Sequence, residues 1–250
     1  MKGIGLFVLA TLFLALLAVP SWGQLRKDRP LINPGYDLGR PLHFGFSMGI
    51  NFMDAEVKNN QIVVQDENGK NVLLWSDVSS ITPGFNVNII AELRIKENLS
   101  LRFLPGMAFG QRTLSFYEIR VEKKNLDSLY HQMKIESSMI EFPLLVKYSA
   151  KRHSNSKPYL VGGINPRYDL AAKKKFSEGV YVAFNPLDVY MELGVGVDFY
   201  LPYFKFSTEL KYSRGFFNVL SSRKSEGYEY FPRTINGVVS DMIILSFHFE

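Results

Sequence analysis

The chain contains no cysteine, which excludes disulfide bonds, thiolate zinc sites and a lipidated N-terminal cysteine. Basic runs are also scarce: Lys173–Lys175 is the longest, although the net charge is +5 and the pI is about 9.2. A nucleic-acid-binding protein gathers its Lys and Arg into a patch or stripe, and none is visible here. The composition therefore predicts no nucleic-acid partner.

Motifs that carry known chemistry are missing as well. The sequence has no glycine-rich phosphate loop, no HExxH and no Gly-x-Ser-x-Gly. Asp66–Gly69 lacks the remaining ligand spacing of a calcium loop. Of the four histidines, His43 and His248 are interpreted as polar fillers of an interior, His131 as a loop residue and His153 as a turn residue. We expect no catalytic residues, cofactor or metal ion, and hence no enzyme.

Long apolar runs are confined to the N-terminus. Gly3–Val19 is apolar and is followed by Pro20 and the small-x-small site Ser21–Gly23. This order is typical of a secretory signal peptide, so residues 1–23 are predicted to be removed before Gln24. The alternative is a membrane-anchoring helix, but the run is short of the ~20 residues that such a helix usually needs. No later stretch approaches about 18 apolar residues, and no transmembrane helix is predicted there.

What the sequence does have is strict alternation. Apolar side chains occupy every second position of residues 42–52, with glycine or polar residues between them. Successive side chains of a strand point to opposite faces, so one face is apolar and the other polar or small. Similar alternation gives eight strands, most of them of about 9–12 residues, the length that a tilted strand needs to cross a bilayer. The segments are 42–52, 85–93, 99–110, 140–148, 159–168, 189–199, 204–212 and 243–249.

The connections between these strands alternate in length. The short ones are Arg94–Asn98, Ala150–Pro158 and Tyr200–Tyr203, and the long polar ones are Asp54–Ser79, Glu118–Lys134, Asp169–Asp188 and Ser213–Ser240. Outer-membrane barrels join their strands by short periplasmic turns and long extracellular loops. We therefore predict an all-β fold, an eight-stranded antiparallel transmembrane β-barrel over residues 42–250. Outer-membrane lipid surrounds it, and both termini are expected in the periplasm.

Aromatic residues, 14% of the chain, gather near the predicted strand ends. Amphipathic rings form two girdles where a barrel meets the lipid headgroups. The predicted short-turn girdle is Tyr148, Tyr159, Phe199, Tyr200, Tyr203 and Phe204, and the long-loop girdle is Phe116, Tyr117, Tyr212, Phe216 and Phe217.

The opposite face of the strands carries the charges. Carboxylates and bases are balanced there, which predicts a cross-strand ion-pair network in a narrow, filled interior without an aqueous channel. The alternative is a proton or small-solute path through the same residues. The predicted interior set is Glu92, Arg102, Glu141, Lys147, Arg167, Glu192, Asp198, Lys205, Glu209 and Lys211.

Residues 24–41 precede the first strand and are rich in proline, glycine and basic residues. Such a segment has little capacity for regular structure. It is predicted to be a periplasmic N-terminal arm. A plain linker is the first interpretation, and a docking arm or a plug at the barrel mouth is the alternative.

Three stretches resemble a known family. They are Lys134–Arg152 (KIESSMIEFPLLVKYSAKR), Pro158–Ala171 (PYLVGGINPRYDLA) and Leu187–Gly215 (LDVYMELGVGVDFYLPYFKFSTELKYSRG). The chain resembles the PorT family of Bacteroidetes outer-membrane barrels over essentially its whole mature length. One departure is the last strand, where Phe249 is followed by Glu250, whereas barrel-insertion signals commonly finish on an aromatic residue.

The resemblance implies a part in the type IX secretion system, which exports proteins across the outer membrane and in some species serves gliding motility. It brings no catalytic residues and implies a structural or assembly role. The leading hypothesis is a non-enzymatic accessory barrel that contacts other secretion components through its arm and long loops. The alternatives are an adhesin or envelope-structural barrel, a small outer-membrane enzyme, and a channel for a small solute or lipid.

Overall fold

The computed structural model describes residues 31–32, 36, 39, 41–60, 62–65, 69, 71–119, 126–173, 181–221 and 230–250. The predicted signal peptide and most of the predicted arm lie outside these residues. Antiparallel strands dominate the described part, beside the short helix α3 (Tyr230–Thr234) and the 3-10 turn η2 (Ala171–Lys173). The strands are β1 (Leu42–Asn59), β2 (Val63–Gln65), β3 (Asn71–Lys96), β4 (Leu99–Phe103), β5 (Gly106–Ile119), β6 (Leu126–Glu141), β7 (Leu144–Ser149), β8 (Ser156–Asp169), β9 (Leu187–Tyr200), β10 (Lys205–Gly215) and β11 (Ile235–Phe249).

Proline divides two of the long strands. Leu104 and Pro105 separate β4 from β5, and Phe142 and Pro143 separate β6 from β7. Proline has no N–H to give to the ladder, so regular pairing is interrupted there. Its carbonyl still accepts, as the Leu104 N–H donates to the Pro143 C=O at 3.0 Å. With β4–β5 and β6–β7 each taken as one strand, and β2 as a short addition to β3, eight strands surround the interior, as predicted.

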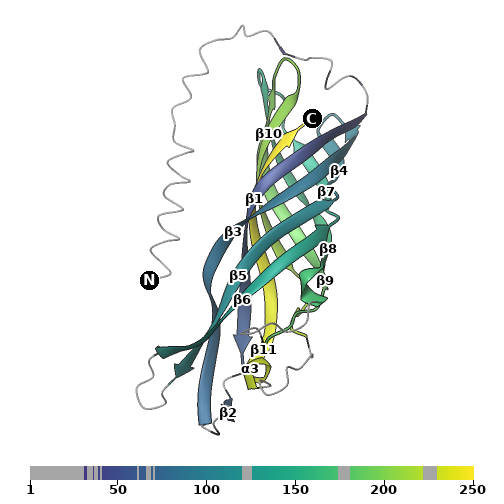
Figure 1. Ribbon diagram of the computed structural model, residues 1–250. Helices are drawn as coiled ribbons and strands as arrows, with labels where there is room; N and C mark the ends of the chain where they lie inside the picture. The colour runs from purple at the N-terminus through teal and green to yellow at the C-terminus, as the bar shows by residue number, and fades with distance from the viewer. Residues whose placement is uncertain are drawn as a thin grey trace. The chain divides into compact units, whose positions relative to one another are not determined.

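The sheet closes because β1 pairs with β11 on one side and with β3 on the other (Figure 1). Paired residues followed once around the ring from Leu42, through β3, β4, β7, β8, β9, β10 and β11, return to β1 ten residues further on, at Phe52. Such a stagger accompanies the strand tilt of about 35–45° that barrels need. A closed ring leaves no unpaired backbone edge, which a sheet in hydrocarbon requires.

The outward face of this ring is apolar. On β1 the side chains of Phe44, Phe46 and Met48 are exposed, whereas Ser47 and Asn51 are buried. The same pattern holds around the ring, with exposed Phe85, Val87, Ile89, Leu93, Val146, Leu160, Leu193, Val195, Leu210, Ile243 and Leu245. An apolar surface of this extent is unfavourable in water and suits lipid. The predicted fold class is confirmed.

Several strands are longer than predicted. β3 has 26 residues, β1 has 18 and β6 has 16. The predicted loops Asp54–Ser79 and Glu118–Lys134 are therefore wrong as loops, since β1 continues to Asn59, β3 begins at Asn71 and β6 begins at Leu126. Figure 1 shows β3, β5 and β6 continuing well past the ends of β8 and β9.

The extensions escaped prediction because their polarity is reversed. On β6 beyond the ring, Gln132 and Lys134 are exposed, whereas Met133 and Ile135 are buried on the inward face. A lipid-facing strand has its apolar side outward, but a strand in water buries it. The same correction applies to His131, which lies in β6 and not in a loop.

The extensions enclose a second, apolar core. Phe231 of α3 lies at its centre, with ring centroids 4.8 Å from Phe116, 5.2 Å from His131 and 5.5 Å from Tyr181. Two of the predicted long loops meet there, because the Asn185 N–H donates to the Val219 C=O at 2.7 Å. We call residues 181–186, 216–221 and 230–234 the cap.

Candidate functional site: the polar interior

All ten charged residues predicted to face the interior are buried, and each takes part in at least one ion pair. They stand on β3, β4, β6, β7, β8, β9 and β10, so the ring itself brings them together. Alternation places each on the inward face, and pairing offsets the loss of hydration of its charge.

Arg102 is the centre of the first group of pairs. Its Nε and Nη2 donate to Glu92 Oε2 at 2.9 and 2.6 Å, while Nη1 donates to Glu209 Oε2 at 3.0 Å. Nη2 also lies 3.2 Å from Glu250 Oε1. One guanidinium thus holds three carboxylates, which the planar fork of arginine suits better than the ammonium of lysine.

Two lysines complete this group. Lys147 Nζ lies 2.8 Å from Asp198 Oδ2 and 3.5 Å from Glu92. Lys205 Nζ lies 2.7 Å from Glu250 Oε2. Because Arg102 and both lysines share Glu92 or Glu250, the pairs form one connected network.

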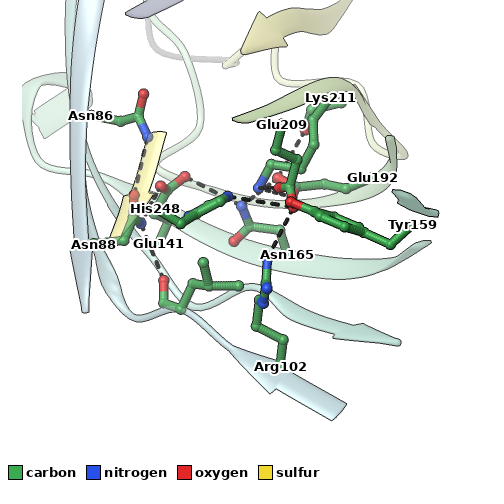
Figure 2. A network of polar contacts seen from close by, with 12 residues as sticks. Asn86, Asn88, Arg102, Glu141, Tyr159, Asn165, Glu192, Glu209, Lys211 and His248 are labelled. Atoms are coloured by element: carbon green, nitrogen blue, oxygen red, sulfur yellow. Dashed lines mark hydrogen bonds and ion pairs between the residues drawn. The ribbon is translucent and has the colours of Figure 1, made fainter. Parts of the chain in front are cut away.

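A second group of pairs includes Glu141, Glu192 and Lys211, which Figure 2 shows among the polar contacts of the interior. Arg167 pairs with Glu192 at 2.7 Å and Glu141 at 3.2 Å, and Lys211 pairs with Glu192 at 3.0 Å. Lys211 Nζ also lies 3.7 Å from Glu209 Oε1, which joins the two groups. The charged network therefore continues along the interior without a gap.

Uncharged and terminal residues that the sequence prediction missed are part of the same network. The Tyr159 hydroxyl donates to Glu209 at 2.9 Å, and Asn165 Nδ2 donates to Glu192 at 2.7 Å. His248, interpreted as a polar filler, is fully buried 3.4 Å from Glu209. Parity was the available signal for Glu250, since residues 248 and 250 of one strand share a face.

The two aromatic girdles are only partly present. Tyr159 and Tyr200 are buried in the interior, and Phe116 is buried in the apolar core of the cap region, so all three were wrongly predicted as interface residues. Tyr148, Phe199, Tyr203 and Phe204 remain exposed at the short-turn end, as do Tyr212, Phe216 and Phe217 at the long-loop end. The prediction failed because it counted distance from the strand end and ignored the side of the sheet.

The cap closes the interior at the long-loop end. Arg112 points inward, donates from Nη1 to Ser240 Oγ at 2.9 Å, and has its guanidinium carbon 5.3 Å from the ring centroid of Phe184. A void of about 20 Å³ remains among Arg112, Arg167 and Asp188. That volume holds about one water molecule.

The short-turn end is covered by described residues of the arm. The Tyr36 ring stacks on His43 with centroids 4.5 Å apart, and its hydroxyl lies 3.4 Å from Glu250 Oε2. Beneath it is a second void of about 20 Å³, lined by Glu92, Lys147 and Lys205 among others. The void at each end therefore has room for about one water molecule.

This arrangement of paired charges joins strands across the interior of the barrel. Among the described residues no three His, Cys, Asp or Glu side chains group as a metal site requires. No helix within the described ranges is long and apolar enough to cross a membrane. The buried charges of the described residues are paired with one another.

A closed antiparallel ring with a lipid-facing belt and an ion-paired interior defines an integral β-barrel of the bacterial outer membrane. The chain belongs to the outer membrane protein beta-barrel domain family, whose model matches residues 22–221. No curated protein has a sequence that matches it.

Solved structures of outer-membrane proteins resemble the chain at low identity. Neisserial surface protein A is 13% identical, with 84% of this chain and 98% of that chain covered and a TM-score of 0.39. OprG from Pseudomonas aeruginosa is 10% identical, with 82% and 94% covered and a TM-score of 0.45. The protease OmpT from Escherichia coli is 10% identical, with 83% and 95% covered and a TM-score of 0.40.

Proposed function

We propose that this barrel is a non-enzymatic component or accessory of the type IX protein secretion system and supports export of cargo proteins through protein–protein contacts. The observation that carries the proposal is the interior, which is filled by paired charges and covered at both ends. A barrel of this kind provides surfaces for protein contacts and no passage for solutes. The secretion role itself is supported by the resemblance of Lys134–Gly215 to the PorT family.

The proposal includes an orientation and a division of the chain. Residues 1–23 are a signal peptide, residues 24–41 a periplasmic arm, and residues 42–250 the barrel. Short turns and both termini face the periplasm, as is usual for outer-membrane barrels, and the cap faces the exterior. Partner proteins then meet the arm on one side and the cap on the other.

Deletion of the gene tests the secretion role. Cargo proteins with C-terminal secretion signals are expected to accumulate in the periplasm and to reach the surface again when the gene is restored. An unrelated outer-membrane barrel serves as the control and is expected to assemble normally in the deletion strain. Normal surface delivery of the cargo in that strain would contradict the proposal.

A second candidate is an adhesin or envelope-structural barrel, which the cap favours because it is a folded structure beyond the ring. This alternative predicts unchanged secretion and altered surface binding in the deletion strain. Purification from crosslinked outer membranes separates the two, since only an accessory of secretion brings secretion components with it. In planar bilayers both candidates predict no conductance, whereas a solute channel predicts discrete current steps.

A further inference from the structure

At the short-turn end, side chains of the barrel bind the arm mainly through its backbone groups. The Ile32 N–H donates to Asn155 Oδ1 at 2.9 Å, and its C=O accepts from Arg152 Nη2. Further along, Arg94 Nη2 donates to the Gly39 C=O at 3.1 Å. Backbone groups are common to all sequences, so these contacts hold a peptide segment with little demand on its side chains.

Tyr36 lies between these two sets of backbone contacts. Among the described residues of the arm, its side chain is the one that packs into a site on the barrel, which we call the Tyr36 site. Its ring stacks on His43, meets the edge of Tyr200 at 5.9 Å, and has Lys205 Nζ 4.9 Å from its centroid. Stacking, edge contact and a cation over the ring each favour an aromatic occupant. The hydroxyl facing Glu250 favours tyrosine among the aromatic residues.

The Tyr36 site lies directly over the charged interior. The void under Tyr36 is lined by Ser100, Lys147, Asp198 and Lys205, which are buried. The Tyr36 ring therefore separates these charges from the space outside the mouth. Removal of the ring is expected to admit water and small reagents to Ser100.

We propose that the short-turn mouth of the barrel is a binding site for a peptide segment centred on tyrosine, which the chain's own arm occupies in cis. A segment of a partner protein with the same chemistry takes the site in trans when the arm leaves it. A short tether gives the arm an effective concentration of about a millimolar, so a partner segment competes against that value. This inference goes beyond the proposed function and does not rest on it.

Peptide binding tests the site on the mature full-length chain in detergent micelles. The probe is a fluorescent peptide of residues 30–41. The receptor is the Tyr36→Ala chain, in which no tyrosine ring fills the Tyr36 site. We expect this chain to bind the peptide at least about tenfold more tightly than the unchanged chain, whose own arm competes. A peptide with alanine at the tyrosine position is expected to lose at least tenfold in affinity. Equal binding by the two chains, or no binding to the Tyr36→Ala chain, would overturn the proposal.

A thiol reagent gives an independent readout because the chain has no cysteine of its own. Ser100→Cys places a single thiol beneath the ring, and its labelling rate is expected to rise at least about tenfold when Tyr36→Ala is added. The peptide should slow labelling again. Tyr203→Ala is the matched control, because Tyr203 is 95% exposed on the β9–β10 turn and its removal should leave the rate unchanged. Equal labelling with and without Tyr36 would show that the ring covers nothing.

Discussion

Arg102 on β4 and Glu209 on β10 lie on diametrically opposite strands, four positions apart in either direction around the ring, yet their side chains meet at 3.0 Å. The contact spans the interior, so the two walls of the barrel are joined through its centre as well as through their backbone ladder. Both side chains are fully shielded from solvent. In such surroundings an unpaired carboxylate is strongly destabilising, which makes the network sensitive to the loss of a single member.

Replacing Arg102 by methionine keeps much of its volume and removes its charge. Glu92, Glu209 and Glu250 then lose their shared partner, and we expect the free energy of unfolding to fall by about 3–5 kcal/mol. Urea unfolding in detergent, followed by tryptophan fluorescence, measures the change. Arg214→Met is the control, since Arg214 also pairs with two carboxylates but is 44% exposed, and a loss below about 1 kcal/mol is expected there. Equal losses would mean that burial of the network does not matter.

The cap depends on Phe231, whose ring is buried among other aromatic side chains. Phe231→Ala should loosen the cap, with a local loss of about 3–5 kcal/mol, while the ring of strands stays folded. Limited proteolysis is the measurement: cleavage within 181–186 and 216–221 should accelerate, and the strands of the ring should resist cleavage. Phe217→Ala, at a 58% exposed position, is expected to leave the cleavage rate unchanged. An unaltered rate in the Phe231→Ala chain would show that the loops hold together without that ring.

Two adjacent glycines on β8 are predicted to respond differently to the same substitution. A Cβ on Gly163 would lie 2.1 Å from the Leu144 carbonyl oxygen, a backbone atom that cannot turn aside. A Cβ on Gly162 would lie 3.1 Å from the Leu193 side chain and 3.7 Å from the Glu192 carbonyl oxygen, which is an ordinary contact distance. We expect Gly163→Ala to destabilise the barrel by about 1–3 kcal/mol and Gly162→Ala by less than about 0.5 kcal/mol. Urea midpoints compare the two, and similar midpoints would contradict the close approach of β7 and β8.

Docking of the arm should weaken in alkali. Burial at the mouth is the main reason that the pKa of the Tyr36 phenol is raised. A free tyrosine ionises near pH 10, so docking is fully favourable below about pH 10 and is lost progressively as the pH rises above it. His43, Lys205, Glu92 and Glu250 also face or act on the phenol.

Those neighbours are unchanged when the probe peptide carries phenylalanine at the tyrosine position. Between about pH 9 and 11, the tyrosine peptide should therefore lose affinity for the Tyr36→Ala chain more steeply than the phenylalanine peptide. Identical pH profiles for the two peptides would show that the phenol is not desolvated in the Tyr36 site.

Much of the ring was predictable because lipid imposes a simple rule on each strand. The alternation that starts at Leu42 fixes which side chains face outward, and the same parity places Arg102 and Glu209 inward. Which carboxylate meets which base was not predictable, because the pairing of Arg102 with Glu209 depends on the stagger of the whole ring. That stagger results from the register of every pair of neighbouring strands, including pairs that are far apart in the sequence.

The cap was missed for a different reason. Beyond the ring the solvent changes from hydrocarbon to water, so Met133 and Ile135 turn inward and the outward positions become polar. If apolar side chains are assumed to face outward along a whole strand, such a reversal is interpreted as the end of the strand. Tyr159 shows the same weakness on a smaller scale, since its position near a turn was given more weight than its parity.

The ten-residue offset between Leu42 and Phe52 has a consequence for how the barrel assembles. A slip of one residue between neighbouring strands would turn charges into lipid, but a slip of two keeps every apolar side chain outward, and the membrane does not oppose it. Sliding β11 by two residues along β10 would carry Glu250 about 7 Å from its present place beside Lys205, beyond the reach of an ion pair. The charges inside thus discriminate among arrangements that look the same from the bilayer, and variants stripped of them should insert in mixed registers.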